Sequence, residues 1–128
     1  MFVDDFKTDL KYRFLEDLRE DELSILLKGL REASTEKHLI FLSVVTYSLA
    51  KASIEALTSF ILDCSCLVTL DLAGTSFSSD TKELLLHMLR NNRRIERLRL
   101  VHCNLEGDEV VDCLLDHPRL VFFEYVAL

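Results

Sequence analysis

Residues 67–77, LVTLDLAGTSF, carry a spacing of apolar residues that recurs along the chain. The first, fourth and sixth positions are leucines. The same spacing occurs in IERLRLVHCNL, residues 95–105. Self-similarity at a period of roughly 20 to 50 residues is typical of chains built from stacked structural units.

Four segments share this spacing and begin at residues 39, 67, 95 and 120, at intervals of 28, 28 and 25. Apolar or aromatic residues occupy the three shared positions of every copy: Leu39, Leu42, Val44; Leu67, Leu70, Leu72; Ile95, Leu98, Leu100; Leu120, Phe123, Tyr125. In the first three copies a further apolar residue stands at the eleventh position: Leu49, Phe77 and Leu105. These short runs predict strands near residues 39–45, 67–73, 95–101 and 120–126.

The spacing resembles the LxxLxLxx(N/C)xL signature of leucine-rich repeats. Cys103 occupies the N/C position of the third copy, whereas Tyr47 and Thr75 stand there in the first and second copies. A period of 28 residues resembles the ribonuclease-inhibitor-like subclass, in which a short strand alternates with an α-helix. Residues 67–128 are also loosely similar to the C-terminal repeat domain of tropomodulins, where two asparagines precede a strand, as residues 91–92 do here.

This resemblance implies an α/β fold, a short leucine-rich-repeat solenoid within a single domain. The expected architecture has a parallel sheet of about four strands on the concave side, helices on the convex side and a helical N-terminal cap. The repeats would then cover residues 38–128 and the cap residues 1–37. Because such folds serve many functions, the fold by itself selects none of them.

The stretches between the strands predict the helices. In SSDTKELLLHMLRNN, Ser78 or Ser79 suits the N-cap, Asp80 lies in the first turn and Arg90 in the last, which predicts a helix from about 80 to 90. Apolar pairs recur ten and six residues before three of the strand segments: Leu57 and Ile61, Leu85 and Leu89, Val110 and Leu114. These matched offsets predict one packing geometry of helix on strand, used three times.

Before residue 39 the pattern changes and predicts helices instead of a further strand. Every fourth residue is apolar at first, as in the stripe of an amphipathic helix: Phe2, Phe6, Leu10, Phe14, Leu18. A second run, residues 21–33, has leucines on one face: Leu23, Leu26, Leu27, Leu30. A cap of this kind would cover the apolar flank of the first repeat. The alternative is a free amphipathic helix for a membrane or a partner, against which its acidic polar face argues.

Strand alternation predicts which side chains face away from the helices. They form three rows across the sheet: Phe41, Thr69, Arg97, Phe122; then Ser43, Asp71, Arg99, Glu124; then Val45, Ala73, Val101, Val126. With strands about 4.8 Å apart, Arg99 would reach both Asp71 and Glu124. The second row is either an exposed charge ladder, worth about 0 to 1 kcal/mol per pair, or the polar centre of a binding surface. The apolar third row favours binding.

We therefore expect a partner protein to contact side chains drawn from all three rows. The candidate partner-binding residues are Phe41, Asp71, Arg97, Arg99, Val101, Phe122, Glu124 and Val126.

The balance of charge argues against nucleic acid and anionic membranes as partners. The chain has 15 Lys and Arg against 22 Asp and Glu, a formal net charge of −7. Five arginines nevertheless cluster within ten residues, at 90, 93, 94, 97 and 99, and five acidic residues follow between 106 and 116. Charge compensation between adjacent repeats is one interpretation of this cluster, and docking of an acidic protein partner is the other.

No arrangement of residues predicts catalysis, a metal or a cofactor, so we expect a protein that is not an enzyme. The four histidines are dispersed, Cys64-Ser65-Cys66 lacks a second cysteine pair, and the three glycines are isolated. The cysteines lie in apolar segments, which indicates reduced thiols and a cytoplasmic location. No apolar run approaches the roughly 20 residues that span a bilayer.

The sequence thus favours a non-catalytic protein–protein interaction module or adaptor. Its partner would bind the concave sheet face or the exposed edge of the last strand. Residues 119–128, RLVFFEYVAL, are rich in β-formers, and the edge of that strand is expected to lack a neighbour. The alternative is a structural self-assembly element, a homodimer formed through this edge.

Overall fold

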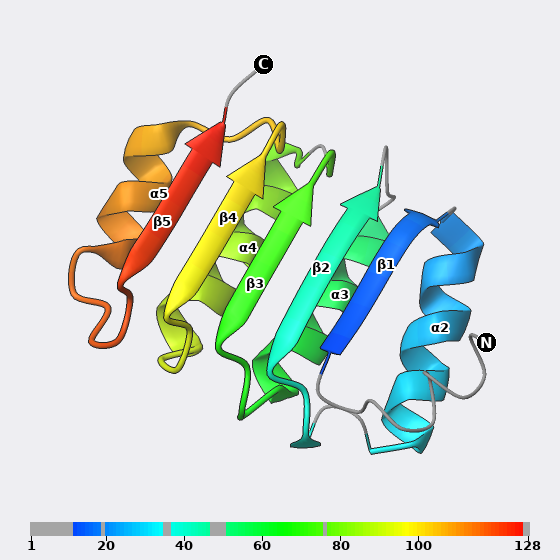
Figure 1. Cartoon of the computed structure of the whole chain (residues 1–128). Coiled ribbons are helices and arrows are strands. Elements are labelled where there is room, and N and C mark those ends of the chain that lie inside the picture. Colours follow the sequence, from blue (N-terminus) through cyan, green and yellow to red (C-terminus); the bar gives the residue numbers. More distant parts are fainter. Residues whose placement is uncertain (1–11, 19, 35–36, 47–50, 76, 127–128) are drawn as a thin grey trace.

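The computed structural model describes residues 12–18, 20–34, 37–46, 51–75 and 77–126, in which strands and helices alternate (Figure 1). The strands are β1 (Tyr12–Leu18), β2 (Phe41–Thr46), β3 (Thr69–Ala73), β4 (Arg97–Val101) and β5 (Phe122–Val126). The helices are α2 (Glu20–Glu32), α3 (Lys51–Asp63), α4 (Ser79–Asn91) and α5 (Gly107–Leu114).

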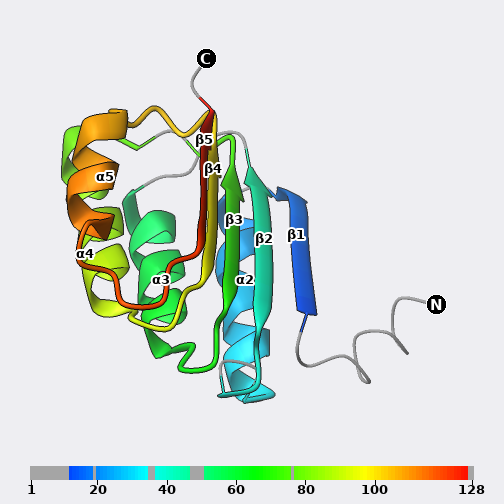
Figure 2. The same cartoon turned by 60° about the vertical axis from the view of Figure 1, so that its left-hand side comes forward.

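The five strands form one parallel sheet in the order of the sequence, β1-β2-β3-β4-β5. Parallel neighbours need a crossover connection, and a helix lies in each of the four connections. All four helices lie on the same side of the sheet (Figure 2). No described element covers the other side, which we call the open face. The predicted α/β fold with a parallel sheet is confirmed.

The N-terminal segment does not form the helix predicted from Phe14 and Leu18. Residues 12–18 form strand β1, which pairs with β2 so that Tyr12 lies beside Phe41. The sheet therefore has five strands instead of about four. The amide and carbonyl groups of β1 complete a hydrogen-bonded ladder along β2. Leu15 is buried in the core at 4% exposure. The other members of the predicted stripe, Phe2, Phe6 and Leu10, lie outside the described residues.

The second predicted helical run agrees with α2. Leu23, Leu27 and Leu30 are buried, and Leu26 is partly buried against the same core, as its predicted apolar face requires. Residues 1–37 thus contain a strand followed by a helix, where a purely helical cap was expected.

The core lies between the sheet and the helices. The ladder aligns Leu42, Leu70 and Leu98 across three strands, and all three are fully buried. The predicted helix pairs pack behind them and are also buried: Leu57, Ile61, Leu85, Leu89, Val110 and Leu114. Each such leucine stabilises the fold by about 1.5–3 kcal/mol through removal of apolar surface from water. The repeated spacing in the sequence is therefore the spacing of core positions.

Helix α4 begins as its sequence predicts. Ser78 is the N-cap, with its Oγ accepting a hydrogen bond from the Thr81 amide at 3.4 Å, while the Thr81 hydroxyl accepts from the Ser78 amide at 2.7 Å. This reciprocal capping box satisfies two main-chain donors that the helix leaves without internal partners. Asp80 in the first turn and Arg90 in the last add favourable interactions with the helix dipole.

Asn92 connects neighbouring units behind the sheet. The buried side-chain amide of Asn92 donates a hydrogen bond to the Ile61 carbonyl oxygen at 3.2 Å. The main-chain carbonyl oxygen of Asn92 lies 2.8 Å from His117 Nε2. The second of the two asparagines noted in the sequence therefore links the end of α3 to the segment after α5. These bonds join three consecutive units on the helix side of the sheet.

Candidate functional site

The parallel register aligns the three predicted rows on the open face. Phe41, Thr69, Arg97 and Phe122 occupy equivalent positions of β2 to β5, and Ser43, Asp71, Arg99 and Glu124 follow two residues further along. Val45, Ala73, Val101 and Val126 form the third row. β1 extends the second row by one strand, because Phe14 pairs with Ser43.

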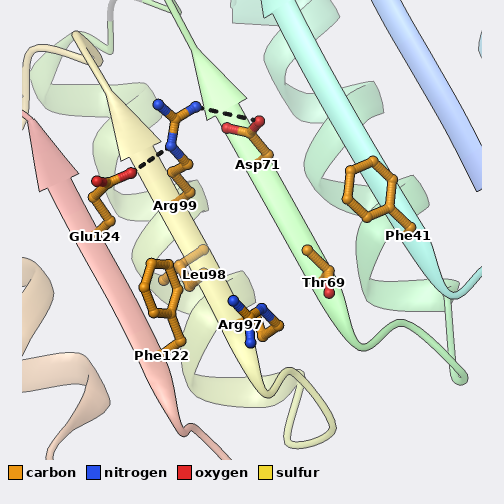
Figure 3. Close-up of a pocket in the computed structure, with 8 residues that line it drawn as sticks. All are labelled: Phe41, Thr69, Asp71, Arg97, Leu98, Arg99, Phe122 and Glu124. Carbon is orange, nitrogen blue, oxygen red and sulfur yellow. Dashed lines mark hydrogen bonds and ion pairs between the residues drawn. The ribbon is translucent and has the colours of Figure 1, made fainter.

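A hollow of about 270 Å³ lies in the open face over β2 to β5 (Figure 3). Six of the eight predicted partner-binding residues line it: Phe41, Asp71, Arg97, Arg99, Phe122 and Glu124. Thr69 and Leu98 line it as well. The other two predicted residues, Val101 and Val126, lie in the third row and do not line it. We refer to this cavity below as the hollow.

Arg99 stands between two carboxylates on neighbouring strands, as the sequence predicts. Its Nε donates a hydrogen bond to Glu124, and its Nη1 lies 3.6 Å from the Asp71 carboxylate. Asp71 also accepts a hydrogen bond from the Ser43 hydroxyl at 3.3 Å. The hydrogen bond to Glu124, and then the charge of Asp71, raise the pKa of the Arg99 guanidinium. Because both pairs are solvent-accessible, each contributes about 0 to 1 kcal/mol to stability.

Arg97 makes a different contact, although it lies only two residues away on the same strand. Its guanidinium carbon lies over the Phe122 ring at 4.7 Å from the ring centroid. Figure 3 shows the two side chains side by side at one end of the hollow. Stacking of this kind contributes about 0.5–1 kcal/mol at an exposed site and holds the planar guanidinium in one orientation.

Two further aromatic rings lie across the hollow from Arg97. The rings of Phe14 and Phe41 have centroids 5.0 Å apart and are tilted by 43°. Phe14 is 64% exposed, which is unusual for so large an apolar side chain in a strand. Its contribution to this face was missed because the spacing of Phe14 and Leu18 favoured a helix. YRFL gives no alternation of apolar and polar residues, because Phe14 and Leu15 are adjacent, so no local signal in the sequence reveals this strand.

The arginine cluster is only partly compensated by the acidic segment that follows it. Arg93 donates a hydrogen bond to the main-chain oxygen of Asp116 at 3.1 Å, instead of pairing with a carboxylate. The ion pair that does join the two units is between Lys82 of α4 and Glu109 of α5, at 3.0 Å. Outside the hollow, the charge compensation predicted between adjacent repeats therefore involves Lys82, which is not one of the five clustered arginines.

The cysteines differ in their access to solvent. Cys66 is exposed, whereas Cys64, Cys103 and Cys113 are buried. Burial raises the pKa of the Cys103 thiol to about 11, since a thiolate would lose its hydration there. In the ranges that the structure describes, no group of three His, Cys, Asp or Glu side chains could hold a metal ion.

None of the helices within the described ranges has the length and apolar character needed to cross a membrane. No protein-family model matches the chain, and no curated protein matches its sequence.

Proposed function

We propose that the chain is a non-catalytic protein-binding domain of the leucine-rich-repeat type, which binds a partner protein on its open face. The α/β units that alternate at intervals near 28 residues, with every helix on one side of the sheet, support the repeat interpretation. In such an arrangement one sheet face is buried and the other presents a regular lattice of side chains. A partner can be recognised by several strands at once.

The observation that carries the proposal is the exposure of aromatic rings around the hollow. Phe14 is 64% and Phe122 39% exposed, and Phe41, which contacts Phe14, is partly exposed. Isolated exposed apolar residues are ordinary, but three aromatic rings on one sheet face, two of which line a cavity, are typical of an interaction site. Arg97 and Arg99 add the residue type most enriched, together with aromatics, at the energetic centre of interfaces.

The hollow suits a peptide segment better than a small metabolite. It is shallow and bordered by solvent-accessible side chains, whereas small-molecule sites usually enclose most of the ligand surface. An extended segment lying across the strands could contact Phe41, Arg97 and Phe122 together. The floor of the hollow is a hydrogen-bonded parallel sheet, so little order has to be gained on binding.

The test is a selection of random dodecapeptides displayed on phage, with the intact chain as the immobilised target. A selected peptide is then labelled and its affinity measured by fluorescence polarisation. Thr69→Trp places a large ring in the hollow and should weaken binding by about tenfold or more. The control, Ile25→Trp on the exposed flank of α2, should leave affinity within about twofold, since it lies away from the open face.

Both variants are first compared with the wild type by circular dichroism and urea unfolding, so that only folded proteins are scored. If no peptide is selected, or if Thr69→Trp and Ile25→Trp bind the selected peptides equally well, the open face is not the binding surface.

A second candidate function is self-assembly through the β5 edge, and exposed apolar residues at that end favour it. Within the described residues β5 pairs with β4 alone, and Val121 and Leu115 beside it are 76% and 72% exposed. Val111, one turn before Leu115 on α5, is also exposed. A second copy that paired with this edge would cover all three.

Charge weakens this second candidate relative to the open face. Asp108, Asp112 and Asp116 recur at every fourth residue along and just beyond α5, beside Val111 and Leu115. A two-fold pairing would bring these carboxylates close to their own copies, and like charges at such spacing are destabilising. Self-association should therefore strengthen with salt. Sedimentation velocity at 50 and 500 mM NaCl tests this expectation. If the wild type is a monomer at both salt concentrations and Leu115→Lys sediments in the same way, the dimer is excluded.

A further inference from the structure

The two arginines that line the hollow differ in whether they pair with a carboxylate. Arg99 is engaged by both carboxylates that line the cavity, Asp71 and Glu124. Arg97 lines the same cavity, yet among the described residues no carboxylate pairs with it; its one recorded contact is with the Phe122 ring. Among the residues that the structure describes, the hollow therefore holds one guanidinium without a carboxylate partner.

The orientation of Arg97 also favours one class of ligand. Its guanidinium is exposed and stacked on Phe122, so the planar group is held in orientation by a ring and not by a competing anion. A guanidinium presents parallel N–H groups that match a carboxylate in a bidentate pair, and it loses its hydration more readily than an ammonium group. The ligand group that fits Arg97 is thus a planar anion.

An apolar subsite lies next to Arg97 along the first row. Thr69 is small, and it separates Arg97 on β4 from Phe41 on β2, so a gap lies above it between these two longer side chains (Figure 3). Phe41, on the far side of this gap, is itself packed against the Phe14 ring. An aromatic or large aliphatic side chain placed above Thr69 would contact Phe41 on one flank and the Arg97–Phe122 stack on the other.

The spacing of the two subsites limits the sequence that can occupy them. Neighbouring strands lie about 4.8 Å apart, and residues i and i+2 of an extended chain lie roughly 6.8 Å apart on the same side. A carboxylate over Arg97 and an apolar side chain over Thr69 therefore come from residues one or two positions apart. A segment that crosses the strands in this way would also reach Phe122 at its other end.

A polyanion fits this surface less well than a single carboxylate. Asp71 and Glu124 line the same cavity one row further along the strands, two residues after Thr69 and Phe122, and the whole chain carries a formal net charge of −7. A run of phosphates would meet these carboxylates as soon as it extended beyond Arg97. An isolated acidic side chain flanked by an apolar one avoids them.

Resting on the proposed function, we infer that the hollow recognises a protein segment in which an Asp or Glu lies one or two residues from an aromatic or large aliphatic residue. Arg97 would bind the carboxylate, and the gap above Thr69 between Phe41 and Arg97 would hold the apolar side chain. The Asp71–Arg99–Glu124 ladder would border the site and disfavour a second acidic residue on that side.

The selected dodecapeptides provide the probe. The expected consensus contains an acidic residue one or two positions from an apolar one. Replacement of that acid by its amide, and Arg97→Gln in the protein, should each weaken binding by about tenfold. Combining the two changes should cost little more than either alone, because both remove the same interaction. Arg97→Lys should recover only part of the affinity.

The matched control is Arg94→Gln, which removes an exposed arginine three residues earlier and outside the hollow. It should leave affinity within about twofold, which separates a local contact from a general loss of positive charge.

The inference is overturned if peptides weakened by Thr69→Trp show no acidic consensus, or if they bind Arg97→Gln as well as the wild type; the proposed function then survives. It is also overturned if a dodecathymidylate binds the hollow more tightly than the peptides and depends on Arg97, which would assign the site to nucleic acid. If Thr69→Trp has no effect on any peptide, the proposed function fails together with the inference.

Discussion

Replacement of Gly74 by alanine perturbs the turn that immediately follows β3. The φ of Gly74 is +79°, and a Cβ at this residue would stand 2.0 Å from the main-chain oxygen of Thr46. Carbon and oxygen come no closer than about 3.3 Å in ordinary contacts, so the turn and the end of β2 would have to separate by roughly 1 Å or more. Neither atom belongs to a flexible side chain that could simply rotate away.

The expected cost follows from two contributions. The left-handed conformation costs alanine about 1–2 kcal/mol relative to glycine. Separation of this turn from the end of β2 would break the buried hydrogen bond between the hydroxyls of Thr46 and Thr75, which are 2.7 Å apart, at about 1–3 kcal/mol. Gly74→Ala should therefore lower the free energy of unfolding by about 2–5 kcal/mol, a large fraction of a typical total of 5–15 kcal/mol.

Gly29→Ala is the matched control, since the same methyl group is added at a glycine with nothing within 4 Å. Gly29 lies inside α2, where alanine should raise stability by about 0.5–1 kcal/mol. The assay is urea unfolding followed by far-UV circular dichroism with linear extrapolation. A loss below about 1 kcal/mol for Gly74→Ala, or an equal loss for both variants, would refute the close approach of Gly74 to β2.

The strand β1, the cap of α4 and the thiols allow four further predictions. Leu15→Ala should cost about 2–5 kcal/mol in urea unfolding, because β1 buries this side chain in the core; a change near zero would contradict the pairing of β1 with β2. Ser78→Ala should cost about 1 kcal/mol by loss of the α4 cap, whereas Ser79→Ala, next to it, should be almost neutral. At pH 8 a thiol reagent should modify Cys66 in the folded protein, and Cys103 only after addition of urea. The pKa of the Cys103 thiol is about 11 in the folded protein, against an ordinary value of 9.0. The contribution of this thiol to stability should therefore decline as pH rises from 9 to 11, and this decline should be absent in Cys103→Ala.

The sequence predicts strands β2 to β5 correctly because their core positions are unambiguous. Apolar residues at the first, fourth and sixth positions leave two side chains per strand facing the helices, as Leu70 and Leu72 do. The hydrophobic effect acts on this pattern in every copy, so the same geometry recurs. The helices follow from their own stripes and from the caps.

Strand β1 could not be predicted from local pattern. Arg13 occupies the register position of Leu42, so the apolar spacing of the other copies is broken there. Phe14 and Leu18 are equally compatible with one face of a helix, and short runs of this kind are ambiguous between the two structures. The edge of β2 decides the outcome, because β1 satisfies its main-chain groups along a ladder that no local pattern records.

The open face was predicted in its rows but not in its contacts. Alternation along each strand places Arg97 and Arg99 on the same side, and the sequence predicts the pairing of Arg99 with its two acidic neighbours. Which residues enclose a cavity depends on side-chain sizes across strands, and here the small Thr69 lies in the hollow between Phe41 and Arg97. Phe14 was absent from the predicted site because its strand was not predicted.

The most direct test of the open face is the footprint of a selected peptide on the ¹⁵N-labelled protein. In a ¹H–¹⁵N titration, the amides of Thr69, Arg97 and Phe122 should shift progressively with peptide concentration, while amides in the middle of α3 and α4, on the other side of the sheet, should not. Shifts confined to the helices, or to α5 and the outer edge of β5, would contradict the assignment of binding to the open face.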